Sequence, residues 1–251
     1  MNTSRDGEKP IRRGAGSRRR KRNPRRLLLG VTGSIATGKS TVARMLEEMG
    51  APMIDFDVLS REVMEPDKPA YRDIVSYFGE QVLSKYKTLD REKLKEIVFR
   101  DMEKRKKLES FTHPRILEAY LEKVEHFAKG KEPVIIQAVV PLLIEARLQT
   151  LFDLLLMVYA PEKVQLKRLM ERDGISKKMA MNIILSQMSV EEKKGYCDLI
   201  VDNSGPLEET RRQVEVIWRK LQKIQKERLE GQNKDNPDLN KAGNFTTRSG
   251  K

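Results

Sequence analysis

The sequence predicts an α/β fold in which a parallel sheet of five strands is covered by helices on both faces. Two observations support this prediction. Short apolar runs alternate along the chain with longer segments of helical periodicity. The first apolar run is followed directly by GSIATGKS, residues 33–40, which fits the phosphate-binding pattern G-x-x-x-x-G-K-[ST] without a gap. A chain of 251 residues suits one such domain with an insertion, or at most two domains.

The glycine-rich segment lies between a predicted strand and a predicted helix. Residues 27–31 form the apolar run of a buried strand, and residues 42–49 place apolar side chains on one helical face before Gly50. The backbone N–H groups of the loop and the dipole of the new helix favour an anion. We therefore expect the phosphates of a nucleotide to bind at nine consecutive residues: Gly33, Ser34, Ile35, Ala36, Thr37, Gly38, Lys39, Ser40 and Thr41.

Two side chains of this loop have predicted roles, and two positions have an unusual residue. Lys39 is expected to reach the β and γ phosphates, and the Ser40 hydroxyl is expected to ligate Mg²⁺. Ser34 and Ala36 stand where glycine would give the backbone more freedom.

Residues 51–57 are predicted to form a second short strand that ends in two carboxylates. Side chains two positions apart in an extended segment point the same way, so Asp55 and Asp57 are both expected to face the phosphates. The alternative is that either aspartate caps a helix that begins near Val58.

Residues 62–130 carry helix signals and no convincing strand. One helix is predicted from Pro69 to Gly79, another after Asp90, and a longer one ends at Gly130. The inner face of the longer helix is expected to be Leu117, Tyr120, Leu121, Val124 and Phe127. His113 and Pro114 are placed between two of these helices. An insertion of this size is associated with the pocket of a second substrate.

The remaining strands are predicted at residues 133–140, 152–159 and 198–202. Between the last two strands, Arg168 and Arg172 share a helical face and are followed by a helical segment. Arginines on a mobile lid supply positive charge to a transferring phosphoryl group, although a solvated basic face remains an alternative. The last helix begins near Leu207, and its predicted inner face is Val214, Ile217, Trp218, Leu221 and Ile224.

The net charge of +13 is concentrated at the start of the chain. Residues 1–26 hold eleven basic and two acidic side chains. We expect a disordered basic arm over residues 1–25 that binds polyanions weakly. The alternatives are a solvated tail without a specific partner and a mitochondrial transit peptide.

The single cysteine, Cys197, is expected to be a small core residue. With no long apolar run and no cleavable signal peptide, the expected location is the cytoplasm.

These motifs together resemble bacterial dephospho-coenzyme A kinases. The resemblance covers residues 27 to about 225 in order, and rests on Gly33–Ser40, Asp55-Phe-Asp57 with Arg61, His113-Pro114, Pro141-Leu-Leu with Glu145, Gln165-Leu-Lys-Arg168 with Arg172-Asp173, and Asp202-Asn-x-Gly205. It implies a P-loop kinase with a helical substrate-binding insertion and a helical lid. The implied reaction uses ATP and Mg²⁺ to phosphorylate the ribose 3′-hydroxyl of dephospho-coenzyme A (dephospho-CoA), the last step of coenzyme A synthesis.

The resemblance also implies roles for individual residues. Asp57 is the implied general base, and Arg168 is an implied lid residue near the phosphates. With Lys39 and Arg172 they form the expected catalytic set. Beside Ser40, Asp55 is the expected metal residue, because Gln137 stands where many relatives have an acidic residue. Substrate binding is assigned to Asp55, Arg61, His113, Pro141, Leu142 and Glu145.

The predicted organisation has five parts. After the arm come the α/β core at 26–61, 131–172 and 190–226, the acceptor insertion at 62–130, the lid at 173–189 and a flexible tail at 227–251. The expected partner is dephospho-CoA, without a membrane, in a monomer or small homo-oligomer.

Three other functions are weighed against this one. Shikimate or gluconate kinases also place Asp-x-Asp after the first helix, but they generally lack the long insertion. A GTP-dependent switch needs Asn-Lys-x-Asp, and Asn233-Lys234-Asp235 has the wrong spacing. A nucleic-acid-binding module rests on the arm alone.

Overall fold

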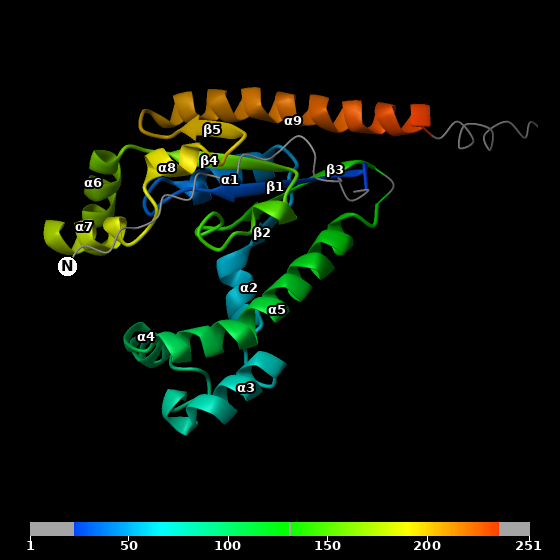
Figure 1. Ribbon diagram of the computed structural model, residues 1–251. Helices are drawn as coiled ribbons and strands as arrows, with labels where there is room; N and C mark the ends of the chain where they lie inside the picture. The colour runs from blue at the N-terminus through cyan, green and yellow to red at the C-terminus, as the bar shows by residue number, and fades with distance from the viewer. Residues whose placement is uncertain (1–22, 131, 236–251) are drawn as a thin grey trace, which may run out of the picture.

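The computed structural model describes residues 23–130 and 132–235, and its centre is a five-stranded parallel sheet (Figure 1). The strands are β1 (Arg26–Thr32), β2 (Met53–Asp55), β3 (Val134–Val139), β4 (Leu154–Tyr159) and β5 (Leu199–Asp202), in the order β2-β3-β1-β4-β5. Every pairing is parallel. The predicted fold class is therefore confirmed, and the central strand β1 delivers the chain directly into the phosphate-binding loop.

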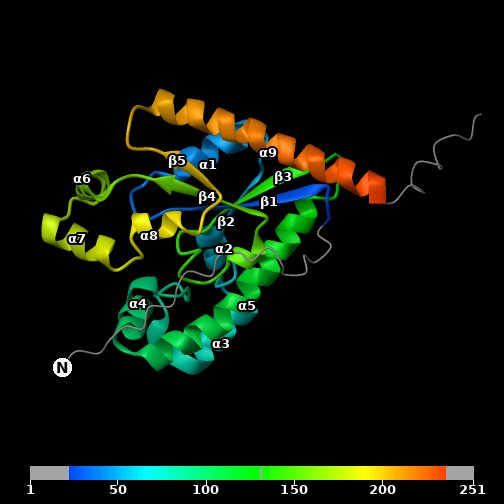
Figure 2. The ribbon, with the colours of Figure 1, turned by 45° about the horizontal axis from the view of Figure 1, so that its top comes forward.

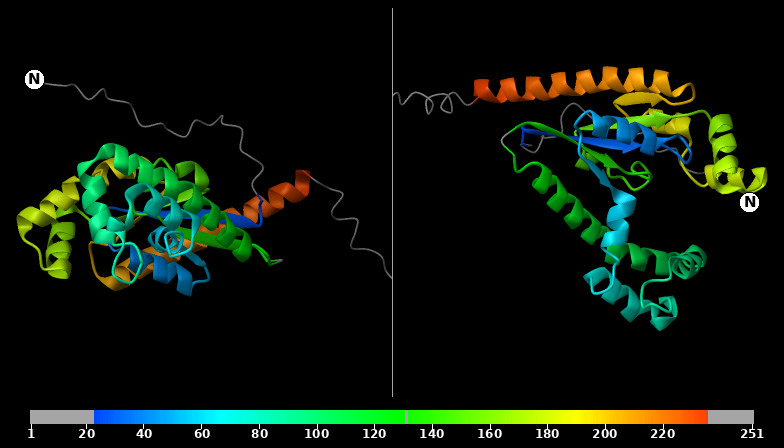
Figure 3. Two further views of the ribbon diagram at one scale, coloured as in Figure 1. Left: turned by 90° about the horizontal axis from the view of Figure 1, so that it is seen from below. Right: turned by 180° about the vertical axis from the view of Figure 1, so that it is seen from behind.

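Helices α1 (Lys39–Glu48) and α9 (Leu207–Asp235) cover one face of the sheet (Figure 3). Val42 and Leu46 of α1 and Val214 and Leu221 of α9 are buried in one cluster with the sheet. Trp218 packs against the same cluster, as predicted. Helix α9 continues to Asp235, so the boundary predicted at residue 226 is wrong. Of the predicted arm at 1–25 and the predicted tail at 227–251, residues 1–22 and 236–251 lie outside the described residues.

The other face of the sheet is covered by α5 (Met102–Phe127), by α8 (Val190–Lys194) and by the connection from β3 to β4, which contains the short helix η2 (Gln149–Leu151). Tyr120 and Val124 of α5 are buried against Ile136 and Leu155 of the sheet. Cys197 is partly buried against this cluster, in agreement with its predicted packing role.

The predicted insertion, residues 62–130, is mainly helical. It follows α2 (Phe56–Glu62), most of which lies in the predicted core, and it contains α3 (Pro69–Phe78), η1 (Glu80–Val82), α4 (Arg91–Arg100) and α5. Pro69 opens α3, and the Asp90 side chain caps α4 by accepting from Lys93 N–H at 3.0 Å. A small core of its own, including Ile74, Phe78 and Leu94, holds α3 and α4 against α5. The helices α3 and α4 therefore pack on a core of their own, away from the sheet, and α2 and α5 join them to it (Figure 1).

Two predictions about α5 are wrong. His113 and Pro114 lie inside this helix, because α5 runs through 26 residues without a break. Proline removes a helical N–H, yet the turn before it is supported by the Arg115 side chain, which donates to Phe111 O at 2.5 Å and pairs with Asp73 of α3 at 2.6 Å. Leu117 and Leu121, predicted to face inward, are 37% and 47% exposed.

Helices α6 (Glu162–Asp173) and α7 (Lys177–Leu185) form a hairpin beyond the carboxyl ends of the strands (Figure 2). Leu169, Ala180 and Ile184 make a small core between the two helices, and Ile35 and Ala36 of the phosphate-binding loop pack against it. The predicted lid, residues 173–189, contains α7, and its role as a lid stays a prediction.

Candidate active site

The phosphate-binding loop folds around the side chain of Lys39. Lys39 Nζ donates to the carbonyl oxygens of Gly33 and Ser34, both at 2.9 Å. Gly38 has a left-handed backbone with φ +89°, and a Cβ atom there would lie 2.1 Å from Asn203 Nδ2, so glycine is required. Ala36 also has a left-handed backbone, with φ +58°, which is unusual for a residue with a Cβ atom.

Asn203, directly after β5, supports the phosphate-binding loop through hydrogen bonds. Its Nδ2 donates to Thr37 O at 2.8 Å, and its Oδ1 accepts from the Thr210 hydroxyl at 2.9 Å. Arg168 of α6 donates through Nη2 to the Asn203 carbonyl at 2.8 Å. The Asp202-Asn-x-Gly205 element thus brings α6, α9 and the phosphate-binding loop together.

A hollow of about 390 Å³ opens beside these groups. Its lining consists of Gly38, Thr41, Arg168, Asn203, Gly205 and Leu207. The Arg168 Nη1 atom is buried without a hydrogen-bond partner among the described residues. The hollow adjoins the phosphate-binding loop on the side away from β2, which suits the base or sugar of a nucleotide.

The arrangement of the two aspartates differs from the prediction. β2 ends at Asp55, and Asp57 lies in the first turn of α2. The Asp55 Oδ1 atom caps that helix by accepting from Asp57 N–H at 2.8 Å and from Val58 N–H at 3.4 Å. The strand therefore stops two residues early because Asp55 offers the backbone a helix cap in place of sheet pairing. The capping alternative is correct for Asp55.

Asp57 and Lys39 influence each other's protonation. The pKa of Asp57 is raised, first by burial and then by the neighbouring Asp55 carboxylate, although Lys39 and Arg61 oppose the shift. The pKa of Lys39 is lowered to about 8, first by burial and then by Lys193, with Arg172 adding to this effect and Asp57 and Glu145 opposing it. Four charged groups, from three helices and one connection, therefore influence the Lys39 ammonium.

The other predicted site residues fall into two groups. Arg172 is close enough to affect Lys39, and its Nε and Nη2 pair with the Asp173 carboxylate at 2.7 and 3.0 Å. Pro141 lies beside β1, where its carbonyl accepts from the Thr32 hydroxyl at 3.3 Å. His113, by contrast, is exposed on α5, and no contact brings it to the phosphate-binding loop. Leu142 is 45% exposed.

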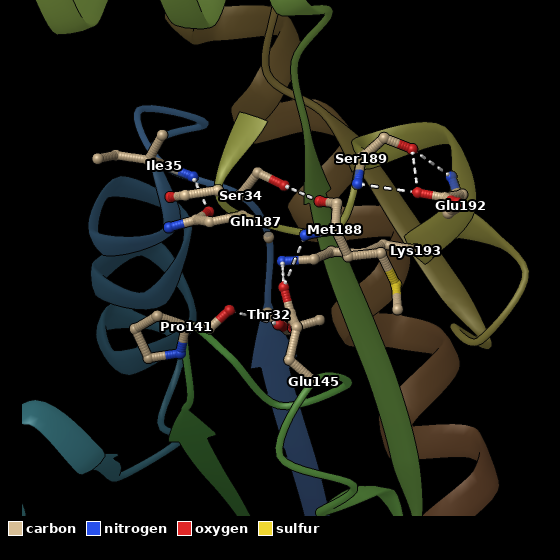
Figure 4. Close-up of polar contacts among 12 residues, drawn as sticks. Thr32, Ser34, Ile35, Pro141, Glu145, Gln187, Met188, Ser189, Glu192 and Lys193 are labelled. Carbon is tan, nitrogen blue, oxygen red and sulfur yellow. Dashed lines mark hydrogen bonds and ion pairs between the residues drawn. The ribbon is translucent and has the colours of Figure 1, made fainter. Parts of the chain in front are cut away.

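Sequence reasoning missed Gln187 and Lys193. Gln187 Oε1 accepts from Ile35 N–H at 3.0 Å, and Lys193 Nζ lies 2.9 Å from Glu145 Oε1 (Figure 4). In the sequence, Lys193 belongs to the run Glu-Glu-Lys-Lys, which reads as a solvated helix surface. Its side chain is nevertheless 0% exposed, and only the tertiary structure shows this.

Comparison with known proteins identifies the family. Residues 27–209 match the family described as dephospho-CoA kinase. The chain belongs to the dephospho-CoA kinase family. The dephospho-CoA kinase of Syntrophus aciditrophicus is 46% identical over 204 residues, which make up 81% of this chain and 86% of that relative. A dephospho-CoA kinase domain-containing protein of Danio rerio is 45% identical over 196 residues, 77% of this chain and 85% of the relative.

A solved structure agrees with this assignment. The dephospho-CoA kinase from Campylobacter jejuni has a TM-score of 0.59 at 31% identity, and the match covers 80% of this chain and 98% of that one. As a member of the dephospho-CoA kinase family, the chain is a kinase that uses ATP. The shikimate- and gluconate-type alternatives are thereby set aside. Among the described helices, none combines the length and apolar character needed to cross a membrane.

Proposed function

We propose that the chain transfers the γ-phosphoryl group of ATP to the ribose 3′-hydroxyl of dephospho-CoA. The observation that carries this proposal is that the Asp57 carboxylate lies within electrostatic reach of the phosphate-binding lysine, Lys39. A proton acceptor and a phosphate-binding cation thus meet at the carboxyl end of the sheet. The helical insertion continues directly from Asp57, so the acceptor side of the site adjoins the ATP side.

Asp57 takes the role of proton acceptor. As the bond between O3′ and the γ-phosphorus forms, the bond to the β,γ-bridging oxygen breaks and ADP leaves. The hydroxyl proton passes to the Asp57 carboxylate, whose raised pKa makes it a better base than an ordinary aspartate. Because the transition state for phosphoryl transfer is loose, positioning of the hydroxyl by Asp57 contributes alongside its basicity.

The charge on the phosphates is met by groups from several elements. Lys39 and the loop N–H groups hold the phosphates, and Arg172 approaches from the end of α6. Arg168 is anchored to Asn203 and lines the hollow beside Gly38. There it would contact the nucleotide end of ATP.

The donor set at this site fits Mg²⁺. Ser40 is exposed at the start of α1, and the Asp55 carboxylate ends β2. Hydroxyl and carboxylate oxygens are the ligands that Mg²⁺ prefers, usually with waters and substrate phosphates completing its shell. Among the described residues, no group of three or more His, Cys, Asp or Glu side chains could hold a metal ion. Ser40 would hold the ion together with ATP, and Asp55 would contribute one carboxylate. The ion would neutralise charge on the β and γ phosphates.

The acceptor would lie along α2 and α5. Val58, Leu117 and Leu121 are exposed on these two helices, which connect the sheet to the rest of the insertion (Figure 1). Exposed apolar side chains beside a polar catalytic centre suit a long acceptor with apolar and polar parts. Arg61, one turn after Asp57 on α2, would attract the negative charge of dephospho-CoA.

The test is a coupled ADP-release assay with a panel of acceptors. The panel contains dephospho-CoA, shikimate, gluconate and nucleoside monophosphates, each with ATP and Mg²⁺. We expect turnover with dephospho-CoA alone, and mass spectrometry of the product should show one added phosphoryl group. Absence of turnover with dephospho-CoA, while another acceptor reacts, would contradict the proposal.

A further inference from the structure

The connection that returns from the lid hairpin to the sheet is joined to the phosphate-binding loop. We call residues 186–189, between α7 and α8, the return segment. The Ser34 hydroxyl donates to Met188 O at 3.3 Å, and Ile35 N–H donates to Gln187 Oε1 at 3.0 Å (Figure 4). Ser34 is 2% exposed, so this contact is shielded from water. The serine in place of a loop glycine thus has a structural partner.

Glu145 holds the return segment from the opposite side. Its Oε1 accepts from Met188 N–H at 3.3 Å and lies 2.9 Å from Lys193 Nζ. In Figure 4 the Lys193 side chain reaches from α8 across to Glu145, beside Met188 and above Thr32. Met188 is therefore held through both its backbone groups, one by the phosphate-binding loop and one by a carboxylate.

Burial of the Lys193–Glu145 ion pair costs desolvation free energy, so a contribution to stability does not by itself explain the pair. The Lys193 ammonium is fully buried, the Glu145 side chain is 24% exposed, and Glu145 Oε2 is buried without a hydrogen-bond partner among the described residues. Lys193 Nζ lies within ion-pair distance of Glu145 but outside hydrogen-bond geometry. Apolar side chains of similar volume often replace such pairs without loss of stability. A role in holding neighbouring groups in place gives a reason for the charges of Lys193 and Glu145.

We propose that Lys193 is a positioning residue for phosphoryl transfer, which holds Glu145 and, through it, fixes Met188 and the return segment against Ser34 and Ile35. The inference rests on the proposed function, since the lid and the ATP phosphates take part in it. The return segment is one of the two connections of the lid hairpin to the sheet. Fixing it sets where the hairpin, with Arg172 at the end of α6, lies relative to the phosphates.

The first test replaces Lys193 with a neutral side chain. Lys193→Met should lower kcat by at least about tenfold, because small displacements of catalytic groups have large effects on rate. KM for dephospho-CoA should stay within about twofold, since Lys193 is not part of the acceptor surface proposed on α2 and α5. The matched control is Lys194→Met, which removes the neighbouring, partly exposed lysine of the same helix and should keep wild-type kcat.

A double variant distinguishes an effect on the position of the return segment from an effect on folding stability. Lys193→Met leaves Glu145 without its cation and is expected to lower the melting temperature as well. In the double variant Lys193→Met/Glu145→Leu, no unpaired charge remains, so the melting temperature should return toward the wild-type value. Its kcat should stay reduced, because Met188 N–H has lost its acceptor. A stable double variant with wild-type kcat would show that the pair serves folding alone and would overturn the proposal.

A third variant tests the same segment without disturbing a charge. Ser34→Ala removes one hydroxyl and should lower kcat by about threefold or more. If Ser34 and Lys193 act through Met188, the loss in Ser34→Ala/Lys193→Met should be smaller than the product of the two single losses. Wild-type kcat in Ser34→Ala, or losses that multiply in full, would overturn the inference. The wild-type chain is assayed in parallel: if it fails to phosphorylate dephospho-CoA, the proposed function is wrong.

Discussion

Asp57 lies where α2 begins, and its carboxylate is subject to opposing influences. Burial and Asp55 raise its pKa, while Lys39 and Arg61 lower it. We expect Asp57→Asn to reduce kcat by at least about 10²-fold, since asparagine can accept a hydrogen bond but cannot take the proton. ATP affinity, measured by calorimetry, should be nearly unchanged because the phosphates are held by the loop. Asp67→Asn, an exposed position of the insertion, is the control, and a near-normal kcat for Asp57→Asn would exclude the base role.

Lys39 gives the site a predictable dependence on pH. Its pKa in the free chain is lowered to about 8, so above that pH most molecules carry a neutral amine. Bound phosphates favour the charged form of Lys39 and raise its pKa. At a pH between the pKa of the free chain and that of the ATP complex, ATP binding therefore causes Lys39 to take up a proton from solution. ATP affinity should therefore be fully present below pH 8 and weaken as pH rises above it.

Calorimetry can measure this proton directly. Titrations of ATP at pH 9 in two buffers with different ionisation enthalpies should show uptake approaching one proton per ATP bound. The same titrations at pH 7 should show much less uptake by this lysine. Equal proton uptake at the two pH values would contradict the lowered pKa.

At the scale of elements, α9 depends on an interaction beyond its predicted end. Arg228 Nη1 lies 3.1 Å from Asp153 Oδ1, and the Asp153 side chain is only 3% exposed. Asp153 Oδ2 also accepts from Leu28 N–H of β1 at 2.8 Å. The last turns of α9 are thus joined to the start of the central strand through one buried carboxylate.

Removal of the Arg228 guanidinium should loosen this contact. Arg228→Ala is expected to lower the free energy of unfolding by about 1–3 kcal/mol, because Asp153 loses a charged partner. The measurement is urea unfolding monitored by circular dichroism. Lys226→Ala is the matched control, since Lys226 is 79% exposed and its pair with Glu230 is long at 3.9 Å. An equal effect of the two substitutions would show that Asp153 does not depend on Arg228.

Local sequence patterns were sufficient to predict most elements. Periodicity predicted all five strands and the helices that begin at Pro69 and Leu207. It failed at Pro114, because the proline rule is local whereas α5 is held by contacts with α3 and the sheet. It also failed at the end of α9, where a charged sequence without an apolar stripe gives no sign that Arg228 has a buried partner.

The site was predictable where chemistry requires neighbours in sequence. The loop at 33–40 follows from the spacing of its motif, whereas the base role of Asp57 follows from the resemblance and stays a prediction. The strand geometry proposed for Asp57 was wrong, because a helix cap at Asp55 competes with sheet pairing. Lys193 and Gln187 were not predictable, since burial of a lysine depends on residues far away in the sequence, here Glu145.

At the scale of the whole molecule, charge is divided unevenly. Residues 1–22 hold nine of the 50 basic side chains, and they lie outside the described residues. A chain lacking residues 1–22 should keep wild-type kcat and KM, because every site residue lies after this segment. Binding to RNA at low salt, measured by filter retention, should weaken relative to the full chain. Loss of kinase activity on truncation would show that this segment contributes to the site.

The residues that hydrogen-bond to the phosphate-binding loop lie far after it in the sequence. Met188 follows its partner Ser34 by 154 positions, and Asn203 follows Thr37 by 166. During synthesis, the loop therefore leaves the ribosome long before the residues that hold it in shape. We expect a nascent chain to gain affinity for nucleotide only when β5 and the start of α9 have emerged, so that ATP stabilises nearly finished molecules and gives no help to shorter ones.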